Sequence, residues 1–131
     1  MLISQKNSAP LSAAVSRVSS GALEILHVNE KLLNVKGPMP TFLTTLAAKG
    51  FKIVGTSSEP VETGGFSLKG CKDDVIIVLG NEATGVRTTV KNACTDFVNI
   101  PNSAPEGMED VLGSLNVSVA CAVLLTQLKL S

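Results

Sequence analysis

One unbroken apolar run constrains the fold of this chain more than any other feature. Residues 75–79 read VIIVL, five apolar residues without the alternation that a half-exposed strand shows. Such a run is typical of a strand covered on both faces, as in a parallel sheet. It follows Asp73-Asp74 and ends at Gly80, and it is the strongest strand signal in the sequence.

The patterns on either side of this run alternate between helix and strand. We expect helices over residues 12–22, 41–49 and 86–93, and strands over residues 24–28, 51–55 and 97–101. Gly50 suits the position just past a helix end, and Ser114 suits the N-cap of a terminal helix that reaches Leu130. That helix is apolar on nearly all sides, which indicates burial in the core or in a subunit interface. The alternation predicts an α/β fold with a mostly parallel sheet, and 131 residues predict one domain.

Composition argues against several classes of protein. Eleven Lys and Arg balance eleven Asp and Glu, so the net charge speaks against a domain built mainly to grip phosphates. Trp and Tyr are absent, which argues against a base-stacking platform. The three separated cysteines, Cys71, Cys94 and Cys121, argue against a zinc site or a disulfide framework and fit a reducing intracellular setting. No apolar run approaches the ~20 residues of a membrane span. We therefore expect neither a metal nor a membrane partner.

Small or polar residues follow three of the expected strands. The three segments are Gly55-Thr56-Ser57, Gly80-Asn81-Glu82 and Ile100-Pro101. Ligands of open parallel sheets bind beyond the carboxyl ends of the strands, where main-chain groups can recognise an adenine edge or a ribose. The sequence contains neither G-x-G-x-x-G nor G-x-x-x-x-G-K-[ST], so the dinucleotide-binding and P-loop interpretations lose support.

Two polar residues near this edge allow both a structural and a functional interpretation. Glu82 either accepts backbone N–H bonds at the next helix start or positions a substrate. Asn116 either caps the terminal helix or bonds within an interface, or it faces the crevice together with Ser114.

The remaining candidates favour the structural interpretation. His27 is the only histidine and is expected to be an ordinary strand residue rather than a base. Lys69, Lys72 and Lys91 can form a small basic patch, but scattered solvated lysines are the favoured interpretation.

Two spaced motifs resemble those of a known family. They are VLGNEATGV at residues 78–86, and IP at residues 100–101 followed by SLNVSVA at residues 114–120. They resemble the second and third motifs of the SpoU (TrmH) family, RNA ribose 2′-O-methyltransferases of the SPOUT superfamily. NSAPL at residues 7–11 and SGALE at residues 20–24 resemble segments that follow the family's first motif, so the resemblance covers nearly the whole chain. The sequence GVRT at residues 85–88 is similar to that of the fungal mitochondrial large-subunit rRNA enzymes. We therefore expect a mitochondrial location.

The resemblance implies a fold, a cofactor and partners. The fold is an α/β-knot, in which a C-terminal deep trefoil knot forms a cleft for S-adenosylmethionine. The partners are RNA, as large-subunit rRNA methylated at a guanosine ribose, and a second copy bound through the apolar C-terminal helix. Carried over position by position, the cofactor contacts are Thr56, Gly80, Ile100 and Leu115, and the catalytic, RNA-side residues are Glu82, Ser114 and Asn116.

The chain departs from the family pattern at two places. Ala83 stands where the family usually has glycine, and the family's first motif, Asn-x-Gly-x-x-x-Arg, is absent. The only arginines, Arg17 and Arg87, lie outside such a pattern. We therefore expect residues 1–131 to be an N-terminally truncated SpoU-type domain that lacks the first motif and the upstream RNA-binding region. Such a chain is expected to bind the cofactor and to methylate RNA poorly or not at all.

Two other functions stay open at this point. One is a non-catalytic knotted module for binding or assembly in RNA maturation, which would tolerate loss of Glu82 and Asn116. The other is an α/β domain for a different nucleotide, which would prefer ATP or NAD to S-adenosylmethionine.

Overall fold

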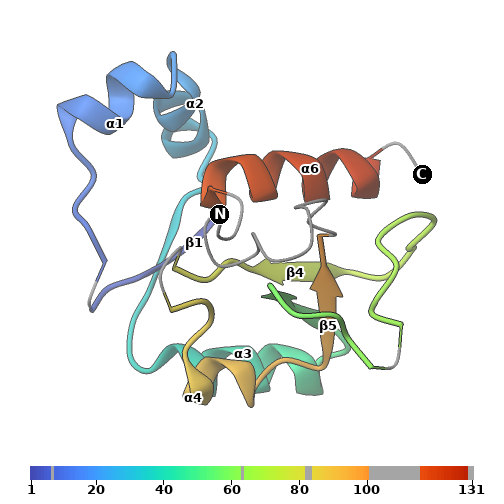
Figure 1. Cartoon of the computed structure of the whole chain (residues 1–131). Helices are drawn as coiled ribbons and strands as arrows, with labels where there is room; N and C mark the ends of the chain where they lie inside the picture. The colour runs from blue at the N-terminus through green and yellow to red at the C-terminus, as the bar shows by residue number, and fades with distance from the viewer. Residues whose placement is uncertain (7, 63, 82–83, 101–115, 130–131) are drawn as a thin grey trace. The chain divides into compact units, whose positions relative to one another are not determined.

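The computed structural model describes residues 1–6, 8–62, 64–81, 84–100 and 116–129. The chain divides into two compact units, Met1–Phe42 and Leu43–Ser131. Each unit contains a parallel sheet, so the expected α/β class with a mostly parallel sheet is confirmed (Figure 1).

The first unit is built on a two-stranded sheet. Strand β1 (Leu2–Ser4) pairs in parallel with β2 (Leu33–Val35), with Leu2 opposite Leu33. The connection between them carries helices α1 (Ala13–Val18) and α2 (Ala22–Val28). Neither strand is expected from the sequence, because three residues are too few to show a period-two alternation.

The single helix expected over residues 12–22 is interrupted. Ser12 caps α1 by accepting a hydrogen bond from the Val15 N–H at 3.4 Å. Ser20 and Gly21 then take φ values of 51° and 87°, which no continuous right-handed helix allows. The Ser19 hydroxyl accepts the Leu23 N–H at 3.2 Å and so supports the first turn of the next helix. The Ser-Ser-Gly sequence therefore ends α1 and starts α2.

The strand expected over residues 24–28 is wrong, because these residues belong to α2. Leu23 and Leu26 are half-buried at helical spacing, whereas Ile25 and Val28 are exposed. A short apolar run does not separate a strand from a helix by periodicity. The break at Gly21 decides the outcome here, and His27 accordingly lies on a helix.

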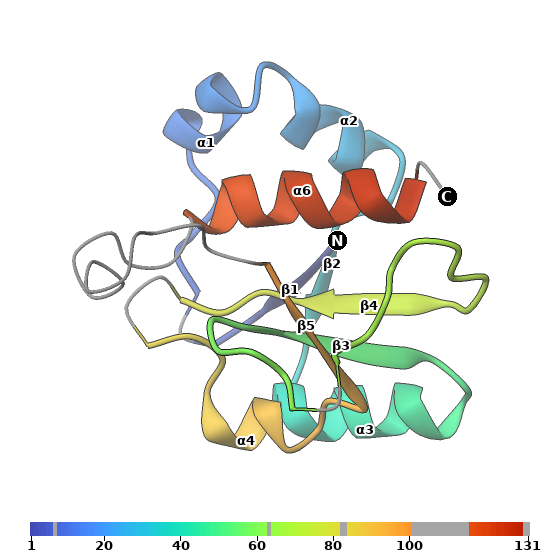
Figure 2. The same ribbon diagram turned by 45° about the vertical axis from the view of Figure 1, so that its right-hand side comes forward.

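The second unit is built on a three-stranded parallel sheet in the order β4-β3-β5 (Figure 2). The strands are β3 (Lys52–Ser57), β4 (Val75–Val78) and β5 (Asp96–Asn99). The central strand β3 buries Ile53, Val54 and Gly55, whereas β4 is only half-buried along its length. The burial on both faces that we expected for residues 75–79 thus belongs to the neighbouring strand, because β4 has one described partner in the sheet.

Helices cover both faces of this sheet. In Figures 1 and 2, α6 (Val117–Lys129) lies on one face and α4 (Thr88–Lys91) on the other. Leu124 of α6 is fully buried in a cluster with Val54, Leu68 and Val98. Val119 and Leu125 of the same helix are 48 % and 51 % exposed. The terminal helix therefore contributes one side to the core of its own unit and leaves apolar side chains on the other.

Helix α3 (Met39–Ala48) spans the boundary between the units and buries Leu43. Gly50 follows it with a φ of 98°, which confirms its expected place just past the helix end. Among the described residues, no helix is long and apolar enough to cross a membrane.

Candidate functional site

Three of the expected cofactor-contact residues meet at one edge of the β4-β3-β5 sheet. Thr56 lies in β3, Gly80 follows the end of β4 by two residues, and Ile100 directly follows β5. Because β3 pairs in parallel with both neighbours, the carboxyl ends of all three strands point the same way. This is the edge at which open parallel sheets bind ligands.

Side-chain hydrogen bonds tie these strand ends together. The Thr56 hydroxyl donates to the Val78 carbonyl at 3.2 Å and joins β3 to β4. The Asn99 side-chain amide donates to the carbonyls of Ser57 and Glu59, both at 3.1 Å, and joins β5 to the loop that follows β3. Hydrogen bonds therefore connect the three strand ends into one edge, and the segments that follow the strands are not independent loops.

Asn99 is not among the candidate residues expected from the sequence. The signal that could have found it is a side-chain amide at the end of an otherwise apolar strand segment, FVNI at residues 97–100. A polar group at such a position needs a hydrogen-bond partner.

Gly80 stands where the backbone folds back on itself. A Cβ atom at this position would lie 2.3 Å from the Gly85 carbonyl carbon and 2.4 Å from the Val86 nitrogen. The turn is closed by two hydrogen bonds, from the Asn81 N–H to the Gly85 carbonyl at 3.0 Å and from the Gly85 N–H to the Asn81 carbonyl at 2.7 Å. Because the obstructing atoms are backbone, only glycine fits at residue 80 without moving the turn.

Asn116 caps the terminal helix. Its Oδ1 accepts the Ser118 N–H at 2.9 Å, and its carbonyl accepts the Ala120 N–H at 2.9 Å. The helix begins at Val117, so the capping interpretation of Asn116 is confirmed. The expectation that Ser114 is the N-cap falls on a residue outside the described ones. The cap uses only the amide oxygen, and the side chain is exposed.

Glu82, Ser114 and Leu115 lie outside the described residues. Their assignment to the catalytic side and to the cofactor contact stays a prediction.

Lys91 and Cys94 have structural environments rather than places at the strand edge. The Lys91 ammonium lies 5.9 Å from the centre of the Phe97 ring, a cation–π contact within the second unit. All three cysteines are free thiols, and burial raises the pKa of Cys94. Within the described ranges, no group of three His, Cys, Asp or Glu side chains could hold a metal ion.

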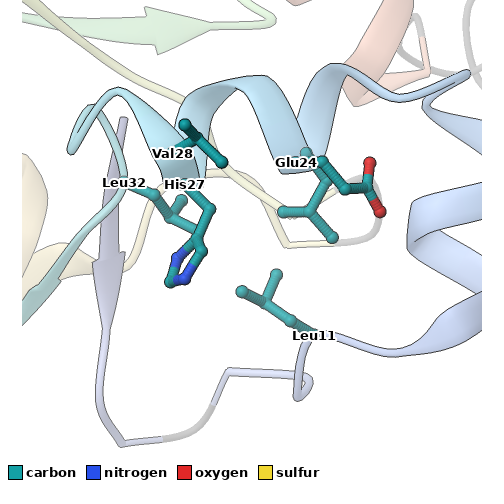
Figure 3. A pocket seen from close by; sticks show the side chains of 6 residues that line it. Leu11, Glu24, His27, Val28 and Leu32 are labelled. Carbon is teal, nitrogen blue, oxygen red and sulfur yellow. The ribbon is translucent and has the colours of Figure 1, made fainter.

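A pocket of about 270 Å³ lies in the first unit, and none of the expected cofactor-contact or catalytic residues lines it (Figure 3). It is lined mainly by apolar side chains, together with Glu24 and His27 of α2. The Ser16 hydroxyl donates a hydrogen bond to the Glu24 carboxylate and lowers the pKa of Glu24. The remaining lining residues are Leu11, Leu23, Val28 and Leu32. Thr56, Gly80 and Ile100 belong to the second unit, and none of them lines this pocket.

The second unit thus has the architecture of an α/β domain, with main-chain groups and small residues at the carboxyl edge of a parallel sheet. The family model described as the SpoU rRNA Methylase family matches residues 1–126. The chain belongs to this family.

Curated relatives agree with this assignment. The chain is 35 % identical to the mitochondrial rRNA methyltransferase 1 of Schizosaccharomyces pombe, over 98 % of this chain and 41 % of that protein. It is 35 % identical to the protein of the same name from Saccharomyces cerevisiae, over 95 % of this chain and 33 % of that protein. The 23S rRNA (guanosine-2′-O-)-methyltransferase RlmB of Vibrio cholerae is 34 % identical, over 95 % of this chain and 45 % of that protein. The chain therefore spans less than half the length of each of these relatives.

Solved structures show the same fold. A TrmH-family structure from Porphyromonas gingivalis matches with a TM-score of 0.72 and 23 % identity, over 97 % of this chain and 47 % of that one. The SpoU methyltransferase AviRb from Streptomyces viridochromogenes, solved in complex with the cofactor AdoMet, matches with a TM-score of 0.71 and 18 % identity. That alignment covers 97 % of this chain and 47 % of AviRb.

Proposed function

We propose that this chain supplies the cofactor-binding part of an S-adenosylmethionine-dependent RNA 2′-O-ribose methyltransferase, with a guanosine of large-subunit rRNA as its substrate. The observation that carries the proposal is the meeting of Thr56, Gly80 and Ile100 at the carboxyl edge of one parallel sheet. Family membership and relatives named as rRNA methyltransferases support the reaction and the RNA class.

The residues present at the edge fit this cofactor. Gly80 permits a turn that a Cβ atom would obstruct, and the neighbouring strands add the Thr56 hydroxyl and the apolar side chain of Ile100 at the same edge. Main-chain groups and apolar side chains suit an adenosine, which carries no phosphate and needs no basic residue. When bound, S-adenosylmethionine supplies an electrophilic methyl group on its sulfonium. We propose that Thr56, Gly80, Ile100 and Leu115 hold it.

The ribose side of the reaction needs polar groups that orient a weak nucleophile. A 2′-hydroxyl must lie in line with the methyl group and must lose its proton as it attacks. We assign this side to Glu82, Ser114 and Asn116. The helix cap fixes the position of Asn116 through Oδ1, and its Nδ2 is the part of the side chain that the cap does not use. That nitrogen is the group we assign to the RNA.

We further propose that residues 1–131 are part of a SpoU-type domain that forms the C-terminal deep trefoil knot and a homodimer through α6. The exposed side chains of Val119 and Leu125, which lie outside the buried cluster around Leu124, support an interface there. The mitochondrial names of the two yeast relatives support a mitochondrial location.

The sequence contains no Asn-x-Gly-x-x-x-Arg pattern, and we propose that the 131 residues alone transfer methyl groups poorly. Methyl transfer from labelled S-adenosylmethionine to large-subunit rRNA tests this point, with cofactor binding measured in parallel. Binding with little transfer is the expected result. Robust transfer by these residues alone would overturn the partial role, and a folded sample that binds no cofactor would overturn the proposed function itself.

The helix-capping role of Asn116 favours one alternative, a non-catalytic module for assembly in RNA maturation. Asn116→Asp separates the two functions because aspartate keeps the capping oxygen and removes the amide N–H groups. In cells carrying this substitution, the enzyme role predicts loss of rRNA ribose methylation. An assembly role predicts normal large-subunit assembly and unchanged methylation.

A further inference from the structure

The side chain of Asn99 joins the end of β5 to the loop that follows the central strand. Asn99 pairs with Ser57 in the β3–β5 register, so the two residues lie side by side at the carboxyl edge. Its Nδ2 donates to the Ser57 and Glu59 carbonyls, both at 3.1 Å. Both bonds connect segments that are more than 39 residues apart in the sequence.

The chemistry of the partners fixes the orientation of this amide. Both partners are carbonyl oxygens, which only accept hydrogen bonds, so the NH₂ group rather than Oδ1 must face them. One NH₂ group carries two hydrogens and can serve both carbonyls at once. Asn99 therefore satisfies two main-chain acceptors with one side chain.

These two bonds determine the path of residues 57–59. The Ser57 and Glu59 carbonyls converge on one nitrogen, and the Ser57 hydroxyl closes the same turn by accepting the Glu59 N–H at 3.2 Å and donating to the Glu59 carbonyl at 3.0 Å. The turn begins one residue after Thr56, and Asn99 immediately precedes Ile100. Asn99 thus lies between two of the proposed cofactor contacts and is bonded to the segment that follows one of them.

We propose that Asn99 is a positioning residue for cofactor binding, which holds the loop at residues 57–59 against the end of β5 and so fixes the spacing of Thr56 and Ile100. This inference rests on the proposed function. Preorganised loops bind more tightly because ordering has already occurred before the ligand arrives. Loss of Asn99 therefore weakens binding more than it weakens the fold, because the bond to Glu59 lies at the exposed edge.

Asn99→Asp is the sharpest variant for the test. It keeps the shape of the side chain, removes both donors and places carboxylate oxygens against two carbonyls. We expect the Kd for S-adenosylmethionine, measured by calorimetry, to rise on the order of ten-fold. Amides of residues 57–62 should exchange with solvent faster in the ligand-free variant. Asn99→Ser keeps one donor and should give an intermediate Kd, which provides the test if the aspartate variant does not fold.

Two control variants act at the opposite edge of the same sheet. Asn92→Asp makes the same change in the segment that leads into β5, and its Kd should stay within about two-fold of the unsubstituted chain. Thr95→Val removes a hydroxyl that bonds both the N–H and the carbonyl of Ile53, so it should lower Tm and leave the Kd unchanged. If Asn99 has only a structural role, Asn99→Asp should, like Thr95→Val, lower Tm and leave the Kd unchanged.

The outcomes separate the two proposals. If the unsubstituted chain binds and Asn99→Asp binds equally well, the positioning role is wrong and the proposed function stands. If the unsubstituted folded chain binds no S-adenosylmethionine, the proposed function fails and the positioning role fails with it.

Discussion

At the scale of single residues, close backbone approaches and local hydrogen bonds shape this protein. Gly80 shows the first, because a Cβ atom there would lie 2.3 Å from backbone. We expect Gly80→Ala to destabilise the second unit by about 1–3 kcal/mol and to weaken S-adenosylmethionine binding, since the turn must open. Calorimetry and denaturant unfolding measure the two effects. In Gly70→Ala, the added Cβ meets open space and only the φ of 78° is strained, so stability should fall by about 1 kcal/mol while affinity is retained.

The Ser16–Glu24 hydrogen bond is expected to make the stability of the fold depend on pH. The bond holds the pKa of Glu24 below its usual range, so it contributes stability above the unfolded carboxyl pKa. That contribution is lost as the pH falls through the lowered, folded-state pKa. Ser16→Ala should raise the pKa of Glu24, which an NMR titration measures. An unchanged titration would show that the hydroxyl does not affect this carboxylate.

At the scale of helices and strands, the terminal helix contributes one side to the core. We expect Leu124→Ala to destabilise the protein by about 2–5 kcal/mol, because it opens a cavity beside Val54 and Val98. Leu33→Ala removes the same atoms from a side chain that is 54 % exposed and lies outside the proposed α6 interface, and it should cost well under half as much. Equal losses in denaturant unfolding would contradict the packing of α6 on this sheet.

Much of the arrangement of helices and strands could be predicted from the sequence, and each wrong prediction has a physical cause. Three features could be predicted because glycine, proline or polar residues bound the apolar runs. They are the α/β class, the C′ glycine of α3 and the convergence of three strand ends at one edge. The segment 24–28 was misassigned because its pattern fits both structures, and the left-handed Ser20-Gly21 break decides between them. The run at 75–79 predicted burial that belongs to β3, because burial depends on sheet order, which the local pattern does not contain. Asn99 was missed because its partners lie about 40 residues away.

At the scale of the whole molecule, the proposed homodimer has a testable consequence. Val119→Lys places a charge on the exposed side of α6, opposite the buried Leu124. We expect a dimer in the unsubstituted chain and a shift toward monomer in the variant, measured by sedimentation or light scattering. Far-UV circular dichroism should show an unchanged fold. A variant that stays dimeric would place the interface elsewhere.

Neutral net charge takes on a different meaning at this scale. The eleven basic and eleven acidic residues speak against these residues alone as a strong RNA-binding domain. They are compatible with a cofactor-binding part whose ligand carries no phosphate. The function therefore depends first on whether the carboxyl edge of the β4-β3-β5 sheet binds S-adenosylmethionine.

Titration calorimetry of the 131-residue chain with S-adenosylmethionine tests that claim most directly, with ATP and NAD as competitors and circular dichroism to verify folding. We expect saturable binding of one S-adenosylmethionine per chain, weaker binding in Gly80→Ala, and no comparable binding of ATP or NAD. A folded chain that shows no binding up to about 1 mM S-adenosylmethionine, or that prefers ATP or NAD, would contradict it.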